Sequence, residues 1–405
     1  MDGDPSVEPG LDGFSRILPL PYRVAIILVC GIWAWGLNLH YLYFVKIDVP
    51  ALIRYSTRTT QRHIPHHHST YRLATFLTIP LAVSFFFFWT ITGGEKEIVR
   101  QWQILPQSYL VFFALCFIVP IQRMSHNGRS RFVQTLKRVS IGGLAQIQDG
   151  KFGDILLADV LTSYAKVLGD LFVSTCMLLS SKTTSTSKPD RGCGGQYLVP
   201  LVISIPSIIR LRQCLIEFVR VRKNRTADSG WGGQHLANAL KYATAFPVII
   251  LSAIQRGYDP KRINMSETGL FRLWLFFVFI NSFYSFYWDV AKDWDLSLFS
   301  SARERNNPEH PWGLRRNRYF HARQMYYTAI VIDFFLRCTW SIKLSPHLDH
   351  FNDLEGGIFL MELLEVVRRW MWIFLRVETE WVRNNKGPAP DDILLGEFGA
   401  KIDED

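Results

Sequence analysis

Acidic and basic residues interrupt the apolar segments in the second half of the chain, and their signs are interleaved. A charged side chain inside a bilayer costs roughly 2.5–3.5 kcal/mol on insertion scales, so such residues are kept where they pair, line water or contact a substrate. The array therefore predicts a path for an anion through a membrane. Its members are Asp159, Arg210, Lys241, Asp289, Asp293, Arg337, Glu365, Arg368 and Arg369.

Two spacings in this array indicate shared helix faces. Asp289 and Asp293 are four residues apart, so a helix places both carboxylates on one face, where they repel unless a cation stands opposite. Glu365 reaches Arg368 at three residues and Arg369 at four, so its carboxylate can hold one guanidinium while the other meets a ligand. The planar, always charged guanidinium suits phosphate oxygens, which it binds through two parallel hydrogen bonds.

Both patterns have a structural alternative. Asp289 and Asp293 also fit the end of a span at the water interface, with Trp288 and Trp294 as interfacial aromatics. Glu365 and its two arginines also fit a buried ion-pair network that binds no ligand.

The remaining cations admit two interpretations as well. Trp340 lies three positions after Arg337 and on nearly the same helix face, so its indole can stack on the guanidinium or close a gate. Arg210 and Lys241 complete the cationic set. Each also fits a long side chain that extends its charged end to the interface.

The sequence carries no signature of a soluble enzyme. It has no P-loop, no dinucleotide-binding glycine pattern, no GxSxG and no HExxH motif. Five of the six cysteines lie in apolar segments, where a free cysteine is usually a small hydrophobe, and Cys193 lies in a loop. We expect no enzyme activity, no metal, no cofactor and no disulfide framework.

Long apolar segments must position the charged residues. Of the 405 residues, 48% are hydrophobic and only 20% are charged, which is rich in apolar residues for a soluble enzyme. Segments near 20 residues cross the hydrocarbon core, and 130–148 is amphipathic, so it lies at the interface or forms a tenth span. The sequence predicts an all-α, polytopic integral membrane helical bundle of about nine to ten transmembrane helices. The nine clear spans are 20–45, 71–93, 104–122, 156–180, 197–219, 236–255, 269–290, 325–344 and 357–382.

Loop charge predicts the orientation of the bundle. Lysine and arginine near span ends favour the cytoplasmic side, and four basic loops alternate with less basic ones. With nine spans, this pattern places the N-terminus outside or in a lumen and the C-terminus in the cytosol. Asn264 begins a glycosylation sequon on the predicted lumenal side, whereas Asn224 begins one on the cytosolic side. The basic loops are 46–72, 122–138, 220–225 and 303–323.

The charged motifs and their flanking residues resemble the EXS domain. The resemblance covers about residues 150–385. The EXS family includes phosphate exporters of plants, the xenotropic and polytropic retrovirus receptor, and a yeast Golgi protein needed to retain ER and Golgi residents. The matching residues are Leu157 to Ser163, Pro206 to Leu215, Asn238 to Tyr242, Trp288-Asp289, Lys292 to Trp294, Tyr326-Tyr327, Asp333, Leu336-Arg337, Trp340, Leu364 to Arg369, Arg376 and Glu378.

The resemblance implies a helical exporter of inorganic phosphate in the lipid bilayer. Glu365 would orient the arginine pair, and Thr162 and Ser163 would donate hydroxyl hydrogen bonds on the Asp159 face. The positions that would line the conduit are Asp159, Arg210, Lys241, Tyr242, Asp289, Asp293, Arg337, Trp340, Arg368 and Arg369.

The chain departs from the long exporters at its start. They carry a cytosolic SPX domain before the first span, whereas about 20 mostly polar residues precede it here. The chain therefore resembles the short yeast Golgi member. We expect a polar tail at 1–19, N-terminal transmembrane helices at 20–148, an EXS-like transmembrane domain at 149–385 and an acidic disordered tail at 386–405.

The resemblance to the short member implies a multi-pass Golgi membrane protein, with the ER or plasma membrane as alternatives. It would return lumenal phosphate to the cytosol and thereby support glycosylation and glycosyltransferase retention. The alternative is a sorting receptor that binds the cytosolic tails of glycosyltransferases, or coat proteins, through its basic loops or acidic tail. A homodimer is left open, and no nucleic-acid partner is expected.

Overall fold

The part of the chain that the computed structural model describes is helical and contains no strand, so the all-α prediction is confirmed there. Asn224, Asn264 and Trp340, and the predicted disordered tail, lie outside these residues. The described ranges are 12–53, 66–119, 126–146, 149–180, 183–223, 231–261, 265–300, 311–315, 317–339 and 355–385.

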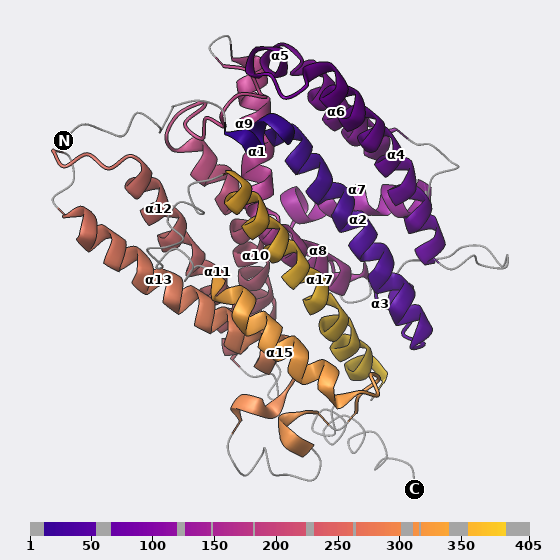
Figure 1. Ribbon diagram of the computed structural model, residues 1–405. Coiled ribbons are helices and arrows are strands. Elements are labelled where there is room, and N and C mark those ends of the chain that lie inside the picture. Colours follow the sequence, from indigo (N-terminus) through magenta and orange to yellow (C-terminus); the bar gives the residue numbers. More distant parts are fainter. Residues whose placement is uncertain are drawn as a thin grey trace, which may run out of the picture.

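Long helices run between two opposite ends of the bundle (Figure 1). Polar side chains cap several of them: Asp12 accepts from the backbone N–H of Ser15 at the start of α1, and Ser266 accepts from that of Gly269 at the start of α13. In the first half of the chain the helices are α1 (Gly13–Ile17), α2 (Leu20–Phe44), α3 (Val49–Leu52), α4 (His66–Thr92), α5 (Lys96–Gln101), α6 (Ile104–Ile118), α7 (His126–Lys137), η1 (Arg138–Gly142), α8 (Lys151–Ser163) and α9 (Ala165–Leu179). In the second half they are α10 (Leu198–Lys223), α11 (Gly233–Ala243), α12 (Ala245–Arg256), α13 (Glu267–Trp288), η3 (Asp289–Asp293), η4 (Ser297–Phe299), η5 (Pro311–Gly313), α15 (Arg323–Arg337) and α17 (Glu355–Asn385).

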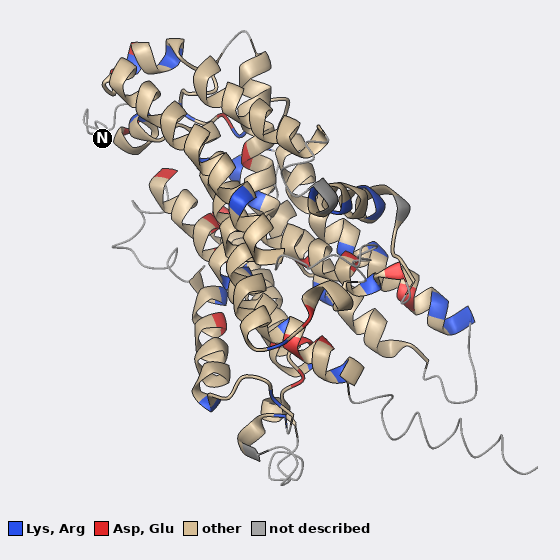
Figure 2. Cartoon of the chain, turned by 90° about the vertical axis from the view of Figure 1, so that its right-hand side faces the viewer, with Lys and Arg blue, Asp and Glu red and all other residues tan. Residues whose placement is uncertain are grey.

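Among the described residues, six helical segments are long and apolar enough to cross a membrane, so the predicted count of nine to ten is not confirmed. Two further predicted spans, 156–180 and 357–382, are largely helical, but each contains several charged residues. Figure 2 shows long helical stretches without charge between charged helix ends and charged positions inside the bundle. The six segments are Leu20–Phe44, His66–Thr92, Lys96–Ile118, Leu198–Lys223, Gly233–Arg256 and Glu267–Asp293.

The outer faces of the bundle are apolar, whereas its interior holds buried charge. On α4 the side chains of Phe86, Phe87 and Trp89 are exposed, as expected where lipid rather than water is the solvent. Inside, Asp289, Asp333 and Glu378 are inaccessible. The interior therefore combines buried apolar clusters with buried charge, and large apolar side chains are exposed on the outer face of α4.

Helix α2 lies at the centre of the packing and contacts α4, α6, α9 and α17. The close approach of α2 to its neighbouring helices depends on small residues, as is typical of membrane helices. A Cβ on Gly31 would overlap the hydroxyl of Tyr164, and one on Gly36 would lie 2.8 Å from the ring of Tyr71. These glycines let α2 pack closely against two neighbours.

Three spans that the sequence predicts as continuous are irregular where the charged residues lie. Tyr164 separates α8 from α9, Thr244 separates α11 from α12, and α13 passes into a π-helical turn at Asp289. Ser163 ends α8 and Lys241 lies in the last turn of α11. Irregular backbone at membrane depth is tolerated where it is buried in protein or lines a cavity, so these interruptions mark the interior of the bundle as the candidate site.

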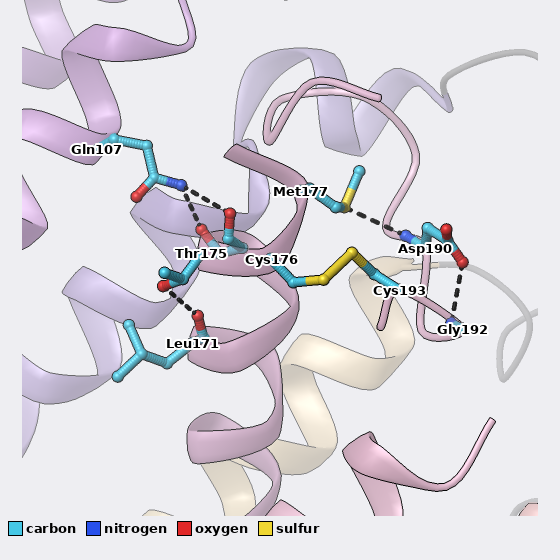
Figure 3. Close-up of a disulfide and its surroundings, with 9 residues drawn as sticks. Gln107, Leu171, Thr175, Cys176, Met177, Asp190, Gly192 and Cys193 are labelled. Carbon is cyan, nitrogen blue, oxygen red and sulfur yellow. Dashed lines mark hydrogen bonds between the residues drawn. A yellow bond between two sulfur atoms is a disulfide. The ribbon is translucent and has the colours of Figure 1, made fainter. Parts of the chain in front are cut away.

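A disulfide joins Cys176 on α9 to Cys193 in the following loop (Figure 3). The expectation of no disulfide was therefore wrong. Cys176 looked like a small hydrophobe because it lies in the apolar segment 156–180, but it is near the end of α9, within reach of the loop. Nearby, the amide of Gln107 donates to the hydroxyl of Ser174, and Asp190 accepts from the backbone of Gly192. The disulfide and the hydrogen bond from the backbone N–H of Asp190 to Sδ of Met177 attach the loop to the end of α9.

Candidate functional site

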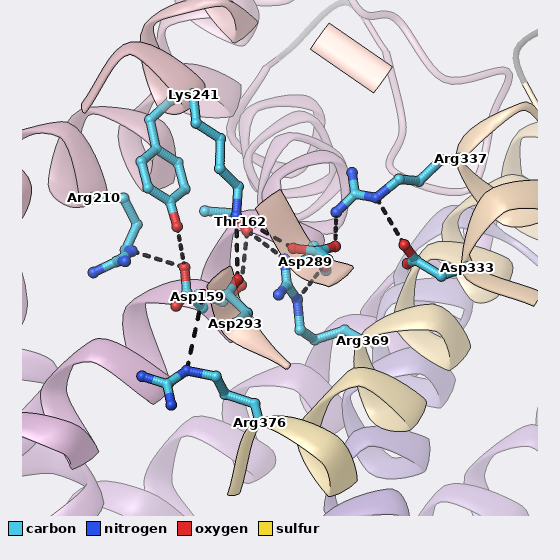
Figure 4. A network of polar contacts seen from close by, with 12 residues as sticks. Asp159, Thr162, Arg210, Lys241, Asp289, Asp293, Asp333, Arg337, Arg369 and Arg376 are labelled. Atoms are coloured by element: carbon cyan, nitrogen blue, oxygen red, sulfur yellow. Dashed lines mark hydrogen bonds and ion pairs between the residues drawn. The ribbon is translucent and has the colours of Figure 1, made fainter. Parts of the chain in front are cut away.

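Buried charged residues from six helical elements meet inside the bundle (Figure 4). At one side Asp159 of α8 forms an ion pair with Arg210 of α10 at 2.7 Å and accepts a hydrogen bond from the hydroxyl of Tyr242 on α11. The Arg210 guanidinium also lies over the Tyr242 ring, 4.8 Å from its centroid. Arg210 is 3% exposed, so it does not extend to the interface.

Lys241 supplies the cation that the two aspartates of η3 require. Its Nζ lies 3.3 Å from Asp289 and 3.4 Å from Asp293, so one ammonium separates two like charges. Asp293 also lies 4.0 Å from Arg376 of α17. Asp289 is buried and Asp293 is partly buried at the end of the apolar segment Glu267–Asp293. Both contact cations of the network, so they do not simply face water there.

Asp289 and Asp333 hold the arginines of α15 and α17. Arg337 pairs with Asp289 and, one helical turn back, with Asp333 at 3.3 Å. Arg368 lies 3.2 Å from Asp333 and 3.5 Å from Asp289. Asp289 therefore contacts three cations, and Asp333 two.

The two neighbouring arginines of α17 differ in their partners. Arg368 is held by Glu365, whose Oε2 accepts from its Nε at 3.0 Å, while Oε1 of Glu365 accepts from the hydroxyl of Ser163 at 2.8 Å. Arg369 contacts no carboxylate among the described residues. Its Nε donates to Ser163 at 2.9 Å and its Nη2 to Thr162 at 3.1 Å.

Two buried guanidinium nitrogens of the network make no hydrogen bond among the described residues, and one of them, Nε of Arg210, still forms an ion pair with Asp159 at 2.7 Å. Nη1 of Arg369 is buried and makes no hydrogen bond, although its guanidinium lies over the Trp372 ring, 4.5 Å from the centroid. An unsatisfied charged donor in the interior is costly and calls for an explanation. Next to it, the Glu365 side chain retains 38% of its accessible surface, so the network is open on this side.

The structure brings together every described residue that the sequence predicts for the path, from Asp159 and Thr162 to Arg369. It adds Asp333 and Arg376, which carried the family resemblance but were not counted as path residues. The signal for Asp333 was present, because it precedes Arg337 by four residues and so shares its face. Arg376 gave no comparable local signal, because its contact with Asp293 joins distant segments.

The chain is similar to known proteins along most of its length. The chain matches the EXS family over residues 18–382, which includes the N-terminal helices as well as the charged network. Protein ERD1 homolog 2 of Schizosaccharomyces pombe is 28% identical over 89% of this chain and 96% of its own length. Protein ERD1 of Kluyveromyces lactis is 33% identical over 59% of this chain and 61% of its own length. The xenotropic and polytropic retrovirus receptor 1 homolog of Xenopus laevis is 28% identical over 90% of this chain and 50% of its own length.

Proposed function

Since the chain belongs to the EXS family, we propose that it conducts inorganic phosphate across a membrane through the charged network of α8, α10, α11, η3, α15 and α17. The observation that carries the proposal is the free Nη1 of Arg369, a buried guanidinium donor beside the hydroxyls of Ser163 and Thr162. A phosphate oxygen at this atom gains a charge-assisted hydrogen bond, worth about 1.5–3 kcal/mol.

The remaining charges keep phosphate binding moderate. An anion that sheds water near the midplane must find replacement donors, yet it must also leave. Asp289 and Glu365 already occupy Arg337 and Arg368 in the empty network, so phosphate competes with carboxylates for those arginines. Phosphate then passes over several sites, each of which binds it with moderate affinity.

The cellular role proposed is return of lumenal phosphate from the Golgi to the cytosol. Glycosyltransfer in the lumen releases nucleoside diphosphates, and their hydrolysis leaves phosphate to be removed. The similarity to proteins named ERD1, of which S. pombe homolog 2 is matched over 96% of its length, supports the short, Golgi-type member of the family. Supporting glycosylation in this way, the protein would affect retention of glycosyltransferases indirectly.

The experiment measures phosphate flux in proteoliposomes with matched amounts of wild type and Arg369→Ala. We expect the variant to lose flux about tenfold or more, since each 1.4 kcal/mol corresponds to a factor of ten. Arg369→Lys keeps the charge without the planar fork and should also lose flux. Arg100→Ala is the matched control, because Arg100 forms an exposed ion pair with Glu97 on α5, far from the network.

Each outcome has a distinct meaning. Equal flux in wild type and Arg369→Ala contradicts the path through Arg369. Absence of flux from folded, inserted wild-type protein contradicts phosphate conduction itself. In that case the sorting-receptor interpretation becomes the one to test, by binding of glycosyltransferase tails to the cytosolic segments.

A further inference from the structure

A second cluster of buried charge lies at the end of the bundle where α2 and α17 begin. Glu355 of α17 accepts from Arg23 of α2 and from Arg191 of the loop before α10, both at 2.6 Å. Arg191 also lies 3.8 Å from Asp170 of α9. One carboxylate thus joins two guanidinium groups that come from segments far apart in sequence.

The other contacts of the cluster fix Arg23 and leave Arg191 dependent on its loop. Arg23 donates to the backbone carbonyl of Leu18 at 2.8 Å and to the hydroxyl of Ser15 at 2.6 Å, and its side chain is 2% exposed. The side chain of Arg191 is 22% exposed, and its partners are the carboxylates of Glu355 and Asp170. Of the two arginines, Arg191 is therefore the one whose position depends on its loop.

The disulfide holds the loop of Arg191 in place. Cys193 lies two residues after Arg191, and its bond to Cys176 attaches the loop to α9, the helix that carries Asp170 (Figure 3). Disulfides form and persist in oxidising compartments, so this end of the bundle faces a lumen or the exterior. The same orientation follows from loop charge, since Arg220, Arg222 and Lys223 lie at the opposite end of α10.

Polar residues recur on α17 between this cluster and the network, separated by apolar ones. Glu355, Glu362 and Arg369 are seven residues apart on α17, so they share one face, and the first and last are about 21 Å apart along the helix at 1.5 Å per residue. Opposite them, Ser163 at the end of α8 is followed by Lys166 and Asp170 on α9. Glu362 is buried at 4% exposure, although it lies between two polar sites.

We propose that Arg23 and Arg191 form an outer oxyanion site on the path, which the carboxylate of Glu355 fills and closes in this structure. The proposal rests on the proposed conduction of phosphate. A carboxylate that bridges two guanidinium groups occupies the position of a phosphate, because both anions offer paired oxygens to the same planar donors. When phosphate arrives from the lumenal side, it takes over Arg191 and Arg23 from Glu355, and the path to Glu362 opens.

The test measures how fast a membrane-impermeant thiol reagent modifies a cysteine introduced by Glu362→Cys. The protein is in sealed proteoliposomes, Cys176 and Cys193 are kept, and modification of the peptide around position 362 is followed by mass spectrometry. Adding Arg191→Gln should accelerate modification about tenfold, the factor for one lost charge-assisted hydrogen bond. The rate is independent of the fraction of molecules facing outward and requires no phosphate flux.

Two further variants and one control keep the test decisive. Cys176→Ser with Cys193→Ser releases the loop while leaving Arg191 intact, and it should also accelerate modification. Arg191→Lys keeps the charge and should give an intermediate rate. Arg100→Gln removes an exposed arginine on α5 and should change nothing.

The outcomes separate this inference from the proposed function. Unchanged modification in both the Arg191→Gln and the double-serine variant overturns closure at the outer site. If modification accelerates and Arg191→Gln also weakens the dependence of flux on lumenal phosphate, the outer site is supported. If modification accelerates but wild-type vesicles carry no phosphate, closure by Arg191 holds and phosphate is the wrong anion.

Discussion

Asp289→Asn removes one charge without changing the shape of the network. Asp289 is inaccessible and contacts Lys241, Arg337 and Arg368, so the substitution leaves three buried cations with one fewer counter-charge. Removing one partner of a buried ion pair costs about 3–5 kcal/mol, because the remaining charge stays desolvated. We expect a loss of this size in the free energy of unfolding.

The control is Asp295→Asn, seven residues after the end of α13 and two after the end of η3. Asp295 is 54% exposed and lies 3.7 Å from Arg383, itself 46% exposed. An exposed pair of this kind contributes about 0–1 kcal/mol. Unfolding by denaturant in detergent micelles, followed by tryptophan fluorescence, measures both variants under one condition.

The same substitution makes a prediction for transport. A network with one fewer carboxylate holds phosphate more tightly and releases it more slowly, so we expect both KM and the maximal flux of Asp289→Asn to fall. An unfolding free energy that drops no further than in Asp295→Asn would refute the reasoning about shared charge. A raised KM at unchanged maximal flux would refute the moderating role of the carboxylate.

Two further predictions concern packing and the opposite end of the bundle. Gly31→Ala should destabilise the protein by about 1–3 kcal/mol, because the added methyl overlaps the Tyr164 hydroxyl. Removing that hydroxyl with Tyr164→Phe should restore part of the lost stability. Gly13→Ala is the control and should be tolerated, because a Cβ at Gly13 would meet nothing within 4 Å. Glu378→Gln should loosen Arg315 and residues 317–320, because Glu378 accepts from Arg315 and from the backbone N–H groups of residues 319 and 320. Limited proteolysis measures that effect, and an unchanged cleavage pattern would contradict it.

The sequence identified the charged residues but not how they pair. The four-residue spacing of Asp289 and Asp293 correctly called for an opposing cation, and Lys241 is that cation. Its identity was not readable, because the two sides of the pair come from different helices. Local spacing also suggested that Glu365 could hold either arginine, whereas Ser163 of α8 decides the choice by contacting Arg369.

Other features depended on long-range packing and were missed. The interruptions at Tyr164 and Thr244 fall within segments that are apolar enough to be predicted as single spans. Cys176 pairs with a cysteine 17 residues away in a polar loop, and only the fold of that loop shows the two to be neighbours. Hydropathy gives the existence of such helices but not their breaks.

Helix α17 contributes residues to both charged clusters and is synthesised after the other helices. Until it has inserted, Asp289 and Asp333 lack Arg368, and Arg23 and Arg191 lack Glu355. A nascent chain without α17 therefore presents unneutralised charges within the membrane, a state that cellular quality control can distinguish from the finished protein. A stop codon shortly before position 355 should thus give early degradation and not a partly active protein, and insertion of α17 would itself be the step that commits the molecule to leave the site of its folding.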